Sequence, residues 1–372
     1  MIRTTFSILI LMTLLSIPAM SAKKAPKPEV WMTHWTPELL GEPDAKWDFV
    51  KHNLDGIDIY INSVIWLTPQ QLERLVQTLK TNQIQLGIEC GLFDWDNDGP
   101  HDWTVPKDKI VQDVVRTKFD GKVGEETANI ELGKLQKLFD AGGVPDYLNL
   151  DDSIRRLMFP GQDLSKPDLK GLPSVDRAVD ELISYMKVWR KRFPKIEFFA
   201  LANFPNWGWK GDTAYWGTGM MNGDYFEALK KIISKTKKAG IPIKGLTADC
   251  PYEYFSATRP HTPWITYAAQ ITPKRERDPA KVDWSARLLD LSKYVRSRGL
   301  EFNLVVNSET GGISAEGFCT GTLKYLDTYR AKKGTANRYI IQTWYKHPEK
   351  ILPESEPHTM TWLTAEVIRK VK

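Results

Sequence analysis

Eight short apolar segments alternate along this chain with amphipathic helical segments. Most of the apolar segments are rich in Ile, Val, Leu and aromatic residues and end in a polar residue and a loop, which is typical of buried parallel strands. Eight such units form a closed (β/α)8 barrel in about 250 residues, so 372 residues accommodate one α/β domain of this kind with inserted loops. The predicted strands are residues 30–35, 57–62, 85–89, 147–151, 196–203, 244–249, 302–309 and 339–344.

Local signals predict the intervening helices. Thr68 and Pro69 are suited to the N-cap and the first turn of a helix, and apolar residues recur at helical spacing after them. Gly240 and Gly299 follow two other helical segments, where glycine ends a helix well. An open doubly wound sheet is the alternative, but no phosphate-binding glycine motif follows any predicted strand. The other predicted helices are residues 130–141, 174–193, 225–239, 284–298, 315–332 and 358–371.

Residues 1–22 have the pattern of a secretory signal peptide. Arg3 supplies the charged start, residues 6–17 are apolar, and Ala19 to Ala22 offer a small-residue cleavage site. A membrane anchor is the alternative, but the apolar run is short for a span of about 20 residues. We therefore expect a secreted or periplasmic protein, with residues 23–29 as a flexible leader, residues 30–372 as the barrel, and no membrane span in the mature chain.

Charge and cysteine content exclude other classes. The 51 basic and 46 acidic residues give a net charge of +5 without a basic block, which argues against a dedicated nucleic-acid-binding protein. The three cysteines, Cys90, Cys250 and Cys319, match no metal-binding spacing, and a chain of this length needs no disulfide, so we expect buried thiols. The sequence assigns no oligomeric state.

One segment resembles a calcium loop. Asp94, Asp96 and Asp98 alternate like the oxygen ligands of such a loop, and Gly99 follows them. The twelfth position is Val105 instead of Glu, which leaves a solvated acidic turn or another type of calcium loop. Apart from this calcium candidate, no metal site and no cofactor are predicted.

The strand ends carry the strongest functional signal. Side chains alternate along a strand, so the apolar residues of each strand face the helices and the other set points into the barrel. The inward set ends in four carboxylates, Glu89, Asp151, Asp249 and Glu309, at the face where barrels of this type carry active sites. Burial of several like charges is costly without a ligand. We therefore interpret these four residues as functional.

A pair of carboxyl groups in a cleft suits cleavage of a glycosidic bond, because one donates a proton while the other attacks the sugar or activates water. Neighbouring polar and aromatic residues would bind the carbohydrate. The predicted substrate-binding residues are Glu89, His34, Tyr60, Asn203, Trp207, Asn307, Gln342 and Trp344. Further aromatic residues at or just after strand ends are Trp31, Trp35, Trp66, Trp95, Trp209, Trp216, Tyr252 and Tyr254.

In this layout the chain resembles the TIM-barrel glycoside hydrolases. The resemblance rests on eight strands, carboxylates at the ends of the fourth, sixth and seventh strands, and aromatic loops. It implies a catalytic pair on strands four and seven or on strands four and six. Asp151 is then the predicted proton donor and Glu309 the preferred nucleophile or base, with Asp249 as the alternative and Glu89 in support. Retaining and inverting chemistry both remain open.

Two other functions fit the same residues. A barrel that binds carbohydrate without catalysis would use the aromatic residues alone. A lyase acting on acidic polysaccharides would use Tyr252 and Arg155 near the carboxylate of the sugar. The hydrolase is preferred because a binding protein has no need of several inward acids.

Overall fold

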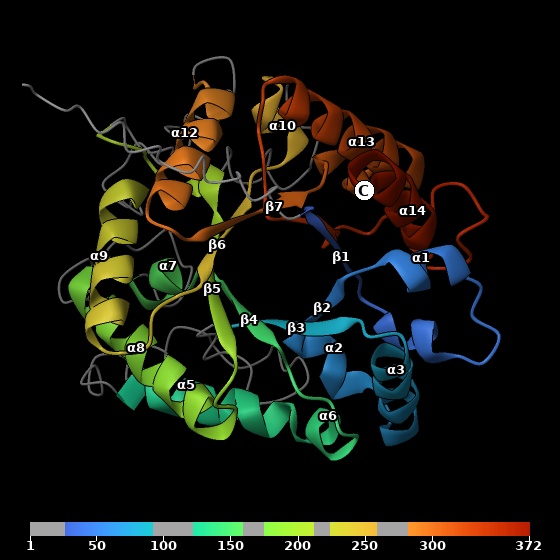
Figure 1. Cartoon of the computed structure of the whole chain (residues 1–372), viewed down its shortest axis with the longest axis horizontal. Helices are drawn as coiled ribbons and strands as arrows, with labels where there is room; N and C mark the ends of the chain where they lie inside the picture. Colours follow the sequence, from blue (N-terminus) through green and yellow to red (C-terminus); the bar gives the residue numbers. More distant parts are fainter. Residues whose placement is uncertain (1–26, 92–121, 159–174, 212–223, 259–281) are drawn as a thin grey trace, which may run out of the picture.

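The computed structural model describes residues 27–91, 122–158, 175–211, 224–258 and 282–372. Eight parallel strands pair in sequence order, and β8 pairs with β1, so the sheet is a closed barrel surrounded by helices (Figure 1). The protein is therefore a (β/α)8 barrel. The strands are β1 (Glu29–Thr33), β2 (Gly56–Tyr60), β3 (Gln85–Cys90), β4 (Tyr147–Asp151), β5 (Glu197–Asn203), β6 (Gly245–Asp249), β7 (Glu301–Val306) and β8 (Arg338–Gln342).

All eight predicted strands are confirmed, with differences at their ends. Glu29 belongs to β1, although the sequence placed it in the leader, and its side chain is paired with Arg338 of β8. Asn62 lies in a helix instead of at the end of β2, and Glu309 lies in a 3-10 turn beyond β7. After both strands the chain stays largely buried, so burial and alternation alone do not mark where strand pairing stops.

The helices α1, α3, α5, α6, α8, α9, α12, α13 and α14 pack outside the strands, whereas shorter elements follow strands directly. The predicted Thr68 cap is confirmed: Thr68 Oγ1 accepts from the Gln71 N–H, and the Gln71 side chain accepts from the Thr68 N–H. The helices are α1 (Asp48–Asn53), α2 (Ile61–Trp66), α3 (Pro69–Thr81), α5 (Lys122–Lys134), α6 (Gln136–Asp140), α7 (Ser153–Met158), α8 (Val175–Arg192), α9 (Tyr225–Lys238), α10 (Tyr252–Phe255), α12 (Trp284–Ser297), α13 (Ala315–Ala331) and α14 (Met360–Val371), with 3-10 turns η1 (Pro37–Gly41), η2 (Phe204–Asn206) and η3 (Glu309–Gly312).

The helix predicted over residues 130–141 is two helices, α5 and α6. The Leu138 N–H bonds to the Leu135 carbonyl three residues back, which tightens the backbone between them. The other predicted helices are confirmed to within two residues at each end, and Gly240 and Gly299 end α9 and α12 with φ values of 72° and 73°.

The predicted alternation of inward and outward side chains is confirmed. The outward residues of the strands join the helices in the main apolar core. Inside the barrel, the rings of Trp31, Tyr147 and Phe199 surround the guanidinium of Arg338, whose carbon lies 4.6, 4.6 and 5.1 Å from the three ring centroids. The barrel is therefore filled by side chains and is not a pore.

A polar column continues from this aromatic layer along the barrel. Asn149 Nδ2 donates to Asp58 Oδ2 at 2.6 Å, and Thr247 Oγ1 donates to Asn149 Oδ1 at 2.7 Å. Burial raises the pKa of Asp58 to about 7, although the hydrogen bond from Asn149 and the charge of Arg338 oppose the shift. Asp58 therefore titrates inside the barrel near neutral pH.

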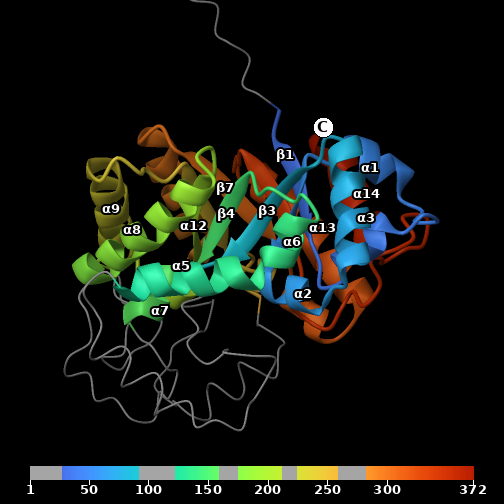
Figure 2. The ribbon, with the colours of Figure 1, turned by 90° about the horizontal axis from the view of Figure 1, so that it is seen from below.

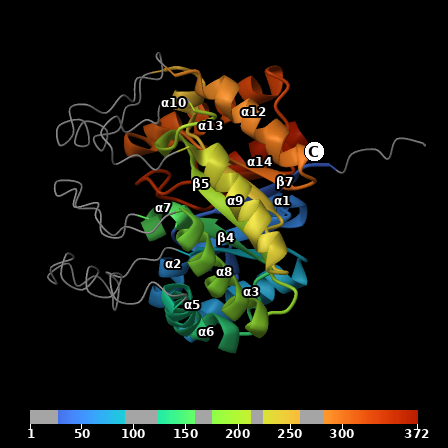
Figure 3. The same ribbon diagram turned by 90° about the vertical axis from the view of Figure 1, so that its left-hand side faces the viewer.

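The helices α2 and α7, which directly follow β2 and β4, lie at the same end of the barrel (Figure 2). The helices α5, α8 and α9 cover one side of it, with α5 packed on α8 and α8 on α9 (Figure 3). Gly124 permits the close approach of α5 to α8, because a Cβ there would lie 1.9 Å from the Glu181 carbonyl oxygen. The carboxyl ends of the strands thus form one mouth on a rigid frame.

The three cysteines are buried free thiols, as predicted. Within the described ranges, no helix combines the length and the apolar character that crossing a membrane requires. Residues 1–22, the proposed signal peptide, and the calcium candidate Asp94, Asp96 and Asp98 lie outside the described residues.

Candidate functional site

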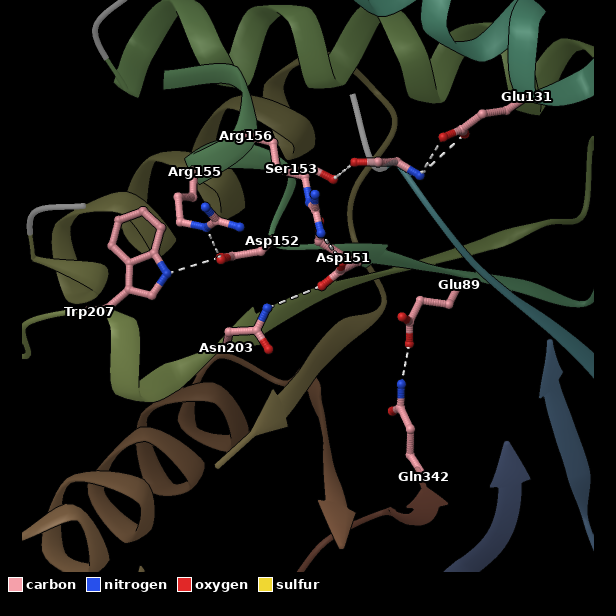
Figure 4. Close-up of polar contacts among 11 residues, drawn as sticks. Glu89, Glu131, Asp151, Asp152, Ser153, Arg155, Arg156, Asn203, Trp207 and Gln342 are labelled. Atoms are coloured by element: carbon pink, nitrogen blue, oxygen red, sulfur yellow. Dashed lines mark hydrogen bonds and ion pairs between the residues drawn. The ribbon is translucent and has the colours of Figure 1, made fainter. Parts of the chain in front are cut away.

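Three of the four predicted carboxylates gather in the mouth of the barrel. Glu89, Asp151 and Asp249 end or nearly end β3, β4 and β6, and each pair among them interacts electrostatically. Figure 4 shows the side chains of Glu89 and Asp151 pointing into the same space from neighbouring strands. The closed barrel thus brings together acidic groups that are distant in the sequence.

Glu89 is held in its protonated form. Its surface is partly accessible, but the surrounding protein desolvates the carboxyl strongly. This burial and the nearby charges of Asp151, Asp58 and Asp249 raise the pKa of Glu89 well above its usual value. Gln342 Nε2 donates to Glu89 Oε2 at 2.6 Å from across the mouth (Figure 4).

Asp249 titrates near neutral pH. Burial, with the charges of Asp151 and Asp152, raises the pKa of this carboxyl to about 7. A hydrogen bond from Asn307 Nδ2 to Asp249 Oδ1, at 3.1 Å, acts in the other direction and limits this increase in the pKa. Asp249 therefore can hold or release a proton at physiological pH.

Asp151 is paired with a cation. Arg156 Nη2 lies 2.6 Å from Asp151 Oδ2, and Arg156 Nε also donates to the Asp151 carbonyl oxygen at 3.1 Å. Asn203 Nδ2 donates to Asp151 Oδ1 at 3.3 Å (Figure 4). Asp151 is therefore an ion-paired and hydrogen-bonded side chain at the end of β4.

The next residue, Asp152, forms a second set of polar contacts beside Asp151. Its carboxylate accepts from Arg155 Nε at 2.5 Å and from Trp207 Nε1 at 3.0 Å. Its backbone has a φ of 46°, which turns the chain sharply between β4 and α7. The turn allows the two arginines of α7 to reach back to the two aspartates.

A buried clamp fixes the end of β3 behind Glu89. The Gly91 N–H donates to Glu131 Oε1 at 3.1 Å, and the Gly91 carbonyl accepts from Ser153 Oγ at 2.7 Å (Figure 4). Gly91 has a φ of 71°, and a Cβ there would lie 2.7 Å from Ser153 Oγ, so only glycine fits. Because Ser153 follows β4, the clamp also joins the ends of β3 and β4.

The structure places Glu309 beyond the last residue of β7. Glu309 is buried on η3, where its charge acts on Tyr254 and Cys250. The residue after β7 that contacts Asp249 is Asn307, which donates a hydrogen bond to it. The chain leaves the strand after Val306, so the alternation of inward and outward residues no longer applies at Glu309.

Several predicted substrate-binding residues do line the mouth. Asn203, Asn307 and Gln342 contact the three carboxylates directly. Within the described part of the chain, the buried atoms Asn307 Oδ1 and Gln342 Oε1 accept no hydrogen bond. Each amide thus has one buried acceptor atom without a partner among these residues.

Aromatic rings edge the mouth beside β8, β1 and β2. The ring of Tyr60 stacks on Trp35 at a centroid distance of 4.2 Å, and the Tyr60 hydroxyl donates to the Thr343 carbonyl at 2.9 Å. Trp344 stacks on Tyr345 at 4.7 Å. Trp35, Trp66 and Trp344 are 44%, 59% and 47% exposed, respectively, so large apolar rings face solvent there.

Two predicted substrate-binding residues have structural roles. His34 is buried, its Nδ1 bonds to Thr36 and its Nε2 to the Pro348 carbonyl, and burial lowers its pKa, so the ring is neutral and fully occupied. Trp207 is completely buried against Tyr225 and holds Asp152. Gly208 follows Trp207 in the sequence, but the Trp207 ring packs against the first residue of α9.

Some of the other aromatic residues expected at strand ends are also buried. Trp31, Trp209 and Tyr254 are buried, and Trp95 and Trp216 lie outside the described residues.

Arg156 is the functional neighbour that sequence reasoning missed. Its spacing from Asp151 and Asp152, close to one helical turn, is the signal that could have identified it. Among the described residues, no group of three or more His, Cys, Asp or Glu is arranged to hold a metal ion.

No protein-family model matches this chain, and no curated protein matches its sequence. Solved structures with a similar shape include the catalytic domain of beta-amylase from Paenibacillus polymyxa, at 11% identity, coverage of 93% of this chain and 99% of that one, and a TM-score of 0.49. GH5_18 from Streptomyces cattleya in complex with GlcNAc has 13% identity, coverage of 92% and 80%, and a TM-score of 0.48.

Orotidine 5'-phosphate decarboxylase from Pyrococcus horikoshii OT3 is also similar, at 10% identity, coverage of 91% and 99%, and a TM-score of 0.34. The names of these proteins refer to more than one activity, since one is an amylase and another a decarboxylase. At these identities the likeness concerns the barrel and assigns no reaction.

Proposed function

We propose that this protein is a glycoside hydrolase that cleaves an oligo- or polysaccharide in the mouth of its barrel. One observation carries the proposal: a carboxylate that is ion-paired with an arginine, Asp151, shares the mouth of the barrel with a carboxyl group whose pKa is raised to about 7, Asp249. Two carboxyl groups in different environments are what acid–base cleavage of a glycosidic bond requires.

In this proposal Asp249 is the proton donor and Asp151 the nucleophile or base. The protonated Asp249 donates to the departing glycosidic oxygen, while Asp151 attacks the sugar carbon or deprotonates a water molecule. Asn203 is a neighbour of both residues. It is paired with Asp249 in the register of β5 and β6, and its side chain donates to Asp151. The pair then lies on strands four and six, one of the two arrangements that the sequence resemblance implies.

The remaining polar groups would orient the sugar. Glu89, held neutral, can donate a hydrogen bond to a sugar hydroxyl while Gln342 donates to its other oxygen. A carboxyl group that donates beside an amide suits a polyhydroxylated ligand.

The aromatic rim supports a carbohydrate substrate longer than one sugar. Trp35, Trp66 and Trp344 expose large flat rings beside β8, β1 and β2, whereas Asp151 and Asp249 lie on β4 and β6. Flat rings stack on the apolar face of a pyranose. We therefore propose that sugar units extend from the carboxylates toward this rim.

The two rival functions are less well supported. A lyase would need Arg155 for the carboxylate of an acidic sugar, but this arginine is already paired with Asp152. A binding protein without catalysis would need no carboxyl group with a pKa near neutrality among its inward acids.

The test is a panel of neutral, amino and acidic polysaccharides, with the release of reducing ends as the measurement. We expect hydrolysis of one class, a loss of at least about a thousandfold in Asp249→Asn and Asp151→Asn, and normal activity in the surface control Asp327→Asn. Calorimetric binding with no product would indicate the binding protein, and an unsaturated product absorbing near 235 nm would indicate the lyase. Full activity in either active-site variant would refute the roles proposed here.

Export is part of the same proposal. We propose that residues 1–22 direct secretion and are removed after Ala22. N-terminal sequencing of the protein recovered outside the cytoplasm tests this cleavage. An intact N-terminus on the recovered protein would contradict it.

A further inference from the structure

The segments that follow β6 and β7 are joined through one buried glutamate. Glu253 of α10 accepts from Ser308 Oγ at 2.6 Å through Oε1 and from the Glu309 N–H at 2.8 Å through Oε2. Its exposed fraction is 2%. Gly321 of α13 lies against the same turn, since a Cβ there would be 2.3 Å from Ser308 Oγ. The turn after β7 is therefore fixed from two sides.

This turn begins at Asn307, the residue that contacts Asp249. The Asn307 carbonyl accepts from the Tyr252 N–H at 3.2 Å, and its side-chain Nδ2 donates to Asp249 Oδ1 at 3.1 Å. Tyr252 and Glu253 are neighbours in the chain, so both backbone and side-chain bonds of α10 act on the same few residues. A shift of the turn would move the Asn307 amide away from the carboxylate.

We propose that Glu253 is a positioning residue for Asp249: it fixes the turn after β7 so that the Asn307 amide donates to the Asp249 carboxylate. The functional consequence rests on the proposed hydrolase activity, in which Asp249 donates the proton. The positioning itself is a property of the folded protein and is measured without a substrate.

The direction in which the pKa of Asp249 changes distinguishes a positioning role of Glu253 from a direct effect of its charge. Removal of a nearby negative charge lowers the pKa of a carboxyl group, whereas loss of a hydrogen bond to its ionised form raises it. Glu253→Gln removes the charge and leaves one acceptor oxygen in place of two. If Glu253 acts through Asn307, the pKa of Asp249 rises in this variant. The other titratable groups that act on or beside Asp249 are Asp151, Asp152, Glu89, Tyr60, Cys250 and Tyr325.

The experiment is a titration of the Asp249 carboxyl by 13C NMR in the full mature protein, with Asp249→Asn identifying the resonance. The wild-type resonance is expected to titrate near pH 7. In Glu253→Gln we expect the midpoint to rise by roughly one pH unit, as for a carboxylate that loses one hydrogen bond. Ser308→Ala, which removes one of the two donors to Glu253, should shift it in the same direction by less.

The matched control is Glu181→Gln. Glu181 is also 2% exposed and accepts a hydrogen bond from a backbone N–H, that of Gly124, but it lies between α5 and α8 outside the strands. This control should lose stability without moving the Asp249 midpoint. An unchanged or lowered midpoint in Glu253→Gln, or in Ser308→Ala if the first variant does not fold, overturns the inference. A raised midpoint in a protein that hydrolyses no carbohydrate would uphold the positioning and reject the proposed function.

Discussion

Asp58 is predicted to make the protein less stable as the pH rises toward neutrality. Its carboxyl is completely buried in the barrel, where its pKa is raised to about 7 from an ordinary value of 3.8. In the unfolded chain it is already ionised above pH 5, so the folded state binds one proton more between about pH 4 and 7. Stability therefore falls through this window and levels off above it.

The substitution Asp58→Asn removes this titration and keeps the shape of the side chain. Each pH unit over which the folded state holds the extra proton contributes about 1.4 kcal/mol, so about 2.5 kcal/mol is expected between pH 5 and 8. Near pH 5 the protonated aspartic acid and the asparagine should give similar stability. Near pH 8 we expect the variant to be more stable than the wild type by that amount.

Urea unfolding followed by circular dichroism at both pH values measures this difference. Glu89 and Asp249 contribute slopes of the same sign in both proteins, so they cancel to first order when wild type and variant are compared. A stability difference that stays constant from pH 5 to 8 would show that Asp58 does not titrate there. The reasoning on burial inside the barrel would then be wrong.

Three other predictions follow from particular contacts. Arg156→Gln removes the cation paired with Asp151 and should lower kcat in the hydrolysis assay at least about tenfold; an unchanged kcat would argue against a role of this ion pair in the proposed reaction. Trp35→Ala and Trp344→Ala should each weaken polysaccharide binding about tenfold, or about 1.4 kcal/mol, with kcat for short substrates retained; equal losses on both substrates would contradict an extended rim. Thr68→Ala should lower the unfolding free energy by about 1 kcal/mol without changing activity, because it removes the N-cap of α3, as thermal unfolding and the hydrolysis assay can check.

The carboxylates in the mouth of the barrel were predictable because they lie on regular strands. Period-two alternation placed Glu89, Asp151 and Asp249 on the inner face, and the closed barrel brings inner-face residues to one mouth. The same rule failed for Glu309, since its segment had already left the strand. Periodicity is informative only as far as the hydrogen-bonded ladder continues.

The protonation roles were not predictable from the same pattern. Asp151 and Asp249 have identical side chains, yet one is paired with Arg156 and the other is buried beside like charges. These environments come from α7 and from the strands around each residue. The order of residue types does not show how strongly each side chain is desolvated. It also does not show which cation pairs with which acid in the folded protein.

By itself, the sequence determined that this chain forms eight strand–helix units and that acidic residues end several of the strands, because local periodicity and capping follow from covalent spacing. Tertiary structure alone decided which of these acids meet, which aromatic rings are exposed and which carboxyl groups keep a proton. Those properties depend on distances and dielectric surroundings between segments far apart in the chain. The closed barrel brings Asp151, with its arginine partner, and Asp249, with its raised pKa, into one mouth.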